Sequence, residues 1–166
     1  IAIGIEALGG SISGQKNIGI GNYALFSNTV GSSNTAVGSG AMMGNESGEF
    51  NTALGRDALF ENEIGHNNVA IGNATMHNNL DGYYNTAVGD SAFYFNIDGA
   101  KNIASGADAL RSNLHGNGNV AQGYGALYSN LNGHNNVAIG YHSLFRNSFQ
   151  NDNVAIGDSS LYQNGL

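Results

Sequence analysis

Carboxylates and histidines are the side chains of this sequence that could do chemistry, and they are few. The chain of 166 residues has 12 Asp and Glu, five His and no Cys. Glu46 and Glu63 lie 17 residues apart, and so do Asp81 and Asp98. Paired carboxylates are typical calcium ligands, whereas a nucleophilic or acid–base site needs different groups in one fixed constellation. The first question is therefore whether the fold places residues 17 apart side by side.

A strict 17-residue repeat runs through the whole sequence. Each repeat has an asparagine followed four places later by a glycine, and no insertion or deletion disturbs the register. The asparagines are Asn17, Asn34, Asn51, Asn68, Asn85, Asn102, Asn119, Asn136 and Asn153, and the glycines are Gly21, Gly38, Gly55, Gly72, Gly89, Gly106, Gly123, Gly140 and Gly157. Such a period is typical of a solenoid, in which each coil stacks on a copy of itself. We therefore expect about ten coils, and number each coil from its asparagine as position 1.

The composition excludes several classes of function. The formal charge is −7 with only five Lys and Arg, which argues against binding the phosphate backbone of a nucleic acid. No apolar stretch approaches the ~20 residues of a membrane helix, and no signal peptide is recognisable in this stretch. Proline is absent, as expected where every backbone N–H is needed by the neighbouring coil.

Positions 2 to 5 predict a short strand that ends at the glycine of position 5. Position 2 is Ile, Val or Thr, position 3 is Ala in every coil except at Gly19, and position 4 is mostly a large apolar residue. Positions 2 and 4 point to one face of such a strand and position 3 to the other. Both faces are apolar or small, so both should be covered. One face is expected to line the coil interior, and we favour another chain as the cover of the other.

The remainder of the coil carries further columns. Position 9 is always Leu, Met or Phe, position 12 is Asn in nine successive coils and position 15 is Gly from Gly14 to Gly133. Asn and Gly tolerate left-handed backbone angles, so positions 12 and 15 are expected to form corners. The asparagines at positions 1 and 12 should form side-chain amide ladders along the axis. Positions 6 to 11 fit either a second strand or a helical turn, and we favour the strand.

Two columns suggest surfaces of contact. Position 10 is often aromatic, and its rings are a candidate contact face for another chain or a glycan: Phe26, Phe60, Tyr94, Tyr128, Phe145 and Tyr162. Ser105 and Gln122 are polar at the otherwise apolar position 4 of adjacent coils. They are expected to hydrogen-bond each other or their equivalents in a partner chain.

The run Asn-Val-Ala-Ile-Gly at 68–72, 136–140 and 153–157, with Asn-Thr-Ala-Val-Gly at 34–38 and 85–89, resembles the head repeats of trimeric autotransporter adhesins of the YadA type. The longer pattern Gly-x-x-Ala-Leu-x-x-Asn-x-x-Gly is similar to repeats of phage tail fibres and bacterial surface fibres. The resemblance implies a left-handed parallel β-roll of three chains that projects from a surface to bind host material. This sequence has longer coils than the adhesin repeats, with the extra residues after position 5.

The repeat also determines which histidines and carboxylates can lie close enough together to form a metal site. His66 and His134 share position 16 but are four coils apart, too far to bind one metal ion. Glu46 with Glu63, and Asp81 with Asp98, would lie ~4.8 Å apart along the axis. We favour solvated corners for these carboxylates, with a calcium site as the alternative, and we expect no cofactor and no enzymatic activity.

We therefore expect an all-β parallel β-solenoid in which residues 1–166 are one repeat array, and a segment of a longer fibre. Its expected role is that of a rigid, self-associating structural or adhesive segment, either as a trimer or as an end-to-end filament. The alternative is a glycan-binding adhesin or phage receptor-binding fibre that uses exposed Tyr and Asn rows. The expected location is extracellular, on a bacterial surface or a phage virion, with no nucleic-acid partner and no membrane insertion.

Overall fold

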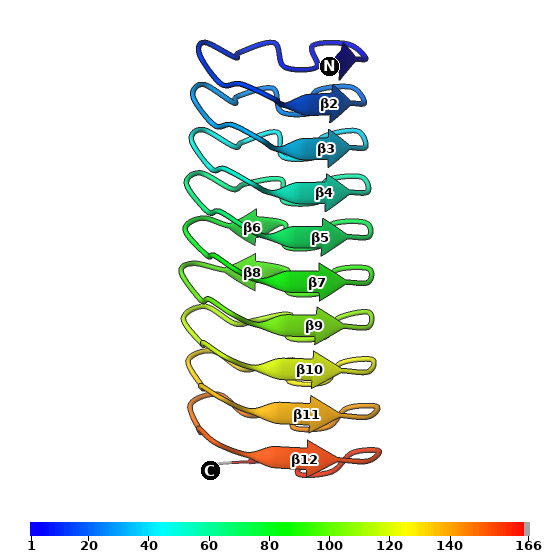
Figure 1. The fold of residues 1–166 in the computed structure, drawn as a ribbon. Helices are drawn as coiled ribbons and strands as arrows, with labels where there is room; N and C mark the ends of the chain where they lie inside the picture. The colour runs from blue at the N-terminus through cyan, green and yellow to red at the C-terminus, as the bar shows by residue number, and fades with distance from the viewer. Residues whose placement is uncertain (165–166) are drawn as a thin grey trace.

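The computed structural model describes residues 1–164 as a straight rod in which each turn of chain lies directly on the one before (Figure 1). The first and the last described residues, 1 and 164, lie at opposite ends of the rod. All regular elements are β-strands, and the described residues contain no helix. The expected parallel β-solenoid is confirmed, with about nine complete turns between the ten strands of its main sheet rather than ten coils.

The main sheet consists of one short strand from each turn. Its strands are β1 (Ala2–Ile3), β2 (Ile18–Ile20), β3 (Thr35–Val37), β4 (Thr52–Leu54), β5 (Val69–Ile71), β7 (Thr86–Val88), β9 (Ile103–Ser105), β10 (Val120–Gln122), β11 (Val137–Ile139) and β12 (Val154–Ile156). Neighbouring strands pair in parallel, and each residue lies opposite the residue 17 places away, as Ala53 lies opposite Ala70. The spacing of 17 in the sequence is therefore the spacing between axial neighbours.

The strand expected over positions 6 to 11 is wrong for positions 6 to 10. These residues form successive tight turns, in which Ala24 N donates to Gly21 O at 3.2 Å and Phe26 N donates to Tyr23 O at 3.2 Å. Positions 7 and 9 adopt positive φ, for example 60° at Tyr23 and 54° at Leu25. A strand requires negative φ at each residue, so this alternation excludes one. Within residues 1–164, a second strand forms only at positions 11 and 12 and only in two turns, as β6 (Asn78–Asn79) and β8 (Phe95–Asn96).

The interior of the rod is filled mostly by alanine at positions 3 and 8, with Thr75 and Ser143 in two turns of position 8, and by the large residue at position 9. The fully buried members at position 9 are Leu25, Met42, Leu59, Met76, Phe93, Leu110, Leu127 and Leu144. A left-handed φ costs a residue with a side chain ~1–2 kcal/mol, whereas burying a side chain of this size contributes ~1.5–3 kcal/mol. The burial term is the larger, so an apolar residue holds a backbone conformation that usually favours glycine.

Two columns of glycine allow the turns to approach each other closely. At position 5 the backbone has a φ near 130°, and a Cβ on Gly89 (φ 138°) would lie 2.6 Å from the carbonyl carbon of Gly106. At position 15 the reason is different, because these glycines have no positive φ and neither do the asparagines of position 12. The expected left-handed corners at positions 12 and 15 are therefore wrong. A Cβ on Gly48 would instead collide with Gly65 O and with the amides of Asn45 and Asn62.

Candidate functional site

The asparagines at position 1 connect each turn to the next through the start of the strand. Asn34 is buried. Its backbone N–H donates to Asn17 Oδ1 at 2.9 Å, and its side-chain Nδ2 donates to Gly48 O at 2.7 Å. This pattern recurs along the column. From Asn102 onward, the side-chain Nδ2 also donates to the preceding Oδ1, as Asn102 donates to Asn85 Oδ1 at 3.1 Å. The expected ladder is confirmed, although most of its axial bonds run from a backbone N–H to a side chain.

The asparagines at position 12 form the more regular ladder of side-chain amides. Asn62 Nδ2 donates to Asn45 Oδ1 at 2.7 Å and to Gly65 O at 2.8 Å, and Asn62 Oδ1 accepts from Asn79 Nδ2 at 2.7 Å. The ladder is interrupted once, because the buried Oδ1 of Asn96 has no hydrogen-bond partner among the described residues. Asn113, in the next turn, donates to Gly116 O instead.

The outward face of the main sheet is apolar and uncovered. Position 3 points into the rod and positions 2 and 4 point out, as expected from the alternation along the strand. The exposed fractions are 48% for Leu54, 37% for Ile71, 41% for Val88 and 49% for Ile103. We call this surface, made by positions 2 and 4 of all turns, the outer sheet face. No other part of the described chain packs over it, so the second layer that the sequence requires does not come from the same coil.

Ser105 and Gln122 are the polar interruption of the outer sheet face. They lie opposite each other in β9 and β10, and both are exposed. Neither side chain makes a hydrogen bond within the described part of the chain. The expectation that they pair with equivalents in another chain stays a prediction.

The side chains at position 10 form a stack along the rod. Successive ring centroids are 4.9 Å apart for Phe60 and His77, 4.9 Å for Tyr128 and Phe145, and 5.1 Å for Phe145 and Tyr162. The rings are half-buried and their faces are turned to one another, which leaves mainly ring edges to solvent. Their role as a contact face stays a prediction.

Arg111 continues that stack where an aromatic residue is missing. Its guanidinium carbon lies 5.0 Å from the Tyr94 ring centroid and 5.9 Å from that of Tyr128, and its Nη1 donates to Asp108 Oδ1 at 2.6 Å. Partial burial lowers the pKa of Arg111, but the hydrogen bond to Asp108 and the nearby Tyr128 outweigh it, so the pKa lies above its ordinary value. Arg111 therefore holds its positive charge between the two rings.

The four paired carboxylates lie at exposed corners. Glu46, Glu63, Asp81 and Asp98 are all exposed, and Asp98 Oδ1 lies 2.8 Å from His115 Nδ1. Within residues 1–164, no group of three or more His, Asp or Glu side chains is placed to hold a metal ion. The same residues include no helix that is long and apolar enough to cross a bilayer.

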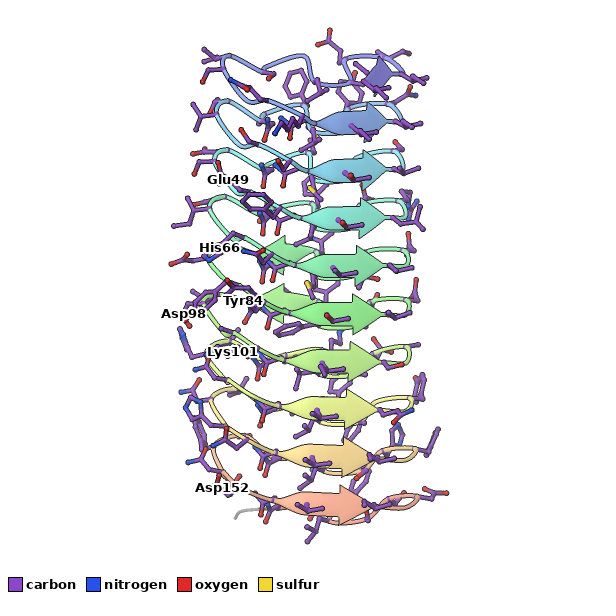
Figure 2. All side chains as sticks on the ribbon, viewed as in Figure 1. Glu49, His66, Tyr84, Asp98, Lys101 and Asp152 are labelled. Atoms are coloured by element: carbon purple, nitrogen blue, oxygen red, sulfur yellow. The ribbon has the colours of Figure 1, made fainter. Side chains whose placement is uncertain are left out.

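One corner of the rod carries a cluster of aromatic side chains that was not predicted from the sequence. His66 stacks on Tyr83 with 5.2 Å between centroids, and Tyr84 meets both rings edge-on at 5.9 Å. Figure 2 shows Glu49, His66 and Tyr84 along one edge of the rod, beside the sheet. The sequence contains one indication of this cluster, because Phe50 and Tyr84 are the only aromatic residues in the column at position 17.

Comparisons of the chain with protein-family models, with curated proteins and with solved structures find no match.

Proposed function

We propose that this chain is a rigid, non-catalytic segment of an extracellular fibre and that copies of it associate through the outer sheet face. The observation that carries the proposal is the uncovered row of Ile, Val, Leu and Thr along that face, which only Ser105 and Gln122 interrupt at position 4. A strand with two apolar faces is normally covered on both. A soluble surface also rarely exposes a contiguous apolar patch of several hundred Å² unless it is an interaction site.

The dimensions of the face favour more than two chains. Ten rows at ~4.8 Å by three residues at ~3.3 Å give roughly 450 Å², about half of the ~800 Å² that each partner contributes to a standard interface. A flat pair of chains would therefore be weak. In a threefold arrangement, the columns at positions 2 and 4 can each meet a different neighbour. We propose three left-handed rods, in keeping with the resemblance to YadA-type head repeats and surface or phage fibres.

The mass of the assembly in solution tests this proposal. Sedimentation and native mass spectrometry of the chain are expected to show a trimer or a longer filament at micromolar concentration. The double variant Ile71→Glu with Val88→Glu places two carboxylates on the outer sheet face and is expected to yield monomers with an unchanged far-UV spectrum. The matched control is Ser39→Glu with Ala107→Glu, because both residues lie at position 6, where Asp90 and Asp158 occur naturally.

A chain that stays monomeric at hundreds of micromolar would contradict the proposal. So would an assembly that the two carboxylates on the outer sheet face leave intact, because the copies would then meet through another surface.

A further inference from the structure

A cavity of about 270 Å³ opens at the corner of the rod that carries the aromatic cluster. It is lined by Ser47, Glu49, Phe50, Ile64, His66 and Asn67. The lining combines a ring and an aliphatic side chain with a hydroxyl, a carboxylate, an imidazole and an amide. Small-molecule sites commonly have this make-up, with an apolar wall and a few polar groups that fix orientation.

Phe50 and Tyr84 are costly for the fold at the places they occupy. Phe50 is 58% exposed with a φ of 57°, and Tyr84 is 55% exposed with a φ of 55°. A bulky residue at positive φ is a conformational outlier, and here its ring is not buried in return. Every turn has a positive φ at this position, and the column otherwise holds Lys16, Ser33, Asn67, Lys101, Gly118, Asn135 and Asp152. The repeat therefore sets the backbone angle, and the two exposed rings are what these turns add to an otherwise non-aromatic column.

The repeat fixes the distance between the two rings. Phe50, Asn67 and Tyr84 occupy position 17 of three successive turns, so their backbones are ~4.8 Å apart and the two aromatic residues are separated by about 10 Å. The Asn67 amide lies between them, with the Glu49 carboxylate beside it in the cavity lining. Two flat apolar rings with hydrogen-bonding groups between them match a ligand whose rings have apolar C–H faces and hydroxyl edges.

We propose that this corner binds an extended carbohydrate chain. Phe50 and Tyr84 stack on the faces of alternate sugar rings, which an extended β-linked chain presents in the same direction. Asn67, Glu49 and Ser47 receive and donate hydrogen bonds to the hydroxyls of the ring between them. The site lies at the edge of the rod and not on the outer sheet face. Carbohydrate binding at this corner is therefore independent of self-association through that face, and the two proposals are tested separately.

Titration of the full chain with three β-1,4-linked hexasaccharides, of glucose, mannose and N-acetylglucosamine, tests the proposal by calorimetry and by NMR shifts of the Asn67 and Tyr84 amides. Phe50→Asn and Tyr84→Asn remove one ring each and introduce the residue that the same column already holds. Each is expected to weaken binding about tenfold, and Glu49→Gln severalfold, while the fold is retained. Phe149→Asn is the matched control, because Phe149 is 60% exposed on a distant turn and Asn132 occupies its place in the preceding one.

Three results would overturn the proposal. The first is that none of the three hexasaccharides binds at millimolar concentration. The second is that Phe50→Asn and Tyr84→Asn bind as tightly as the wild type, or that Phe149→Asn loses binding equally. The third is that tetramethylammonium binds with the same dependence on Phe50 and Glu49 and the sugars do not, which would make the corner a site for organic cations.

Discussion

The break in the amide ladder at position 12 permits a sharp test of how that ladder stabilises the rod. Asn62 and Asn96 hold the same place in their turns and are both buried, with exposed fractions of 0% and 1%. Asn62 makes three hydrogen bonds, two as a donor and one as an acceptor. The Asn96 side chain makes only the two that it donates, to Asn79 Oδ1 at 2.6 Å and Gly99 O at 2.9 Å, and its own Oδ1 is unpartnered among the described residues.

Replacement of each asparagine by alanine leaves the same empty volume but breaks different bonds. At ~1 kcal/mol per buried hydrogen bond, Asn62→Ala is expected to lower the free energy of unfolding by about 3 kcal/mol. Asn96→Ala loses about 2 kcal/mol and regains about 1–2 kcal/mol, because it also removes a buried oxygen without a partner. The two variants should therefore differ by roughly 2 kcal/mol.

Urea unfolding followed by far-UV circular dichroism measures that difference. Repeat arrays can unfold in parts, so hydrogen exchange in the turns around each substitution provides the local measurement. If Asn96→Ala costs as much as Asn62→Ala, the number of ladder bonds that a side chain makes does not determine its contribution to stability.

Four further substitutions have expected outcomes. Ala74→Gly should raise the free energy of unfolding by about 0.5–1 kcal/mol, because Ala74 has a φ of 50°. Ala107 has no positive φ, so Ala107→Gly should lower the free energy of unfolding by a similar amount. Thermal unfolding of the two variants compares the effects. Gly89→Ala should cost about 2–5 kcal/mol in a urea titration, because the new Cβ would collide with the next turn. Arg111→Gln should cost about 1–2 kcal/mol in the same titration by removing the cation between two rings, and an unchanged midpoint would contradict this role.

Much of the candidate surface could be predicted from the sequence, but the corner that carries Phe50 and Tyr84 could not. The alternation at positions 2 to 4 predicted the outer sheet face, and the structure shows it uncovered. The column of rings at position 10 was also visible, but sequence could not tell that the rings would turn their faces to one another. Phe50 and Tyr84 were overlooked because only two members of their column are aromatic, and the exposure of their rings beside the cavity is a property that the sequence does not reveal.

By itself the sequence determined the period, the parallel stacking and the residues that meet along the axis. With an unbroken repeat of 17 residues, identical side chains are stacked in columns along the axis. Buried asparagines and glycines then have neighbours of their own kind. The tertiary structure alone decided the path of the chain between the strands. Positions 7, 9 and 17 are left-handed, whereas the asparagines and glycines of positions 12 and 15 are not, and the large side chains that fill the core are those of Leu25 and its equivalents at position 9. The physical reason is that burial of a large side chain against its neighbours outweighs the local cost of its backbone angle, and that gain exists only after the turns have stacked.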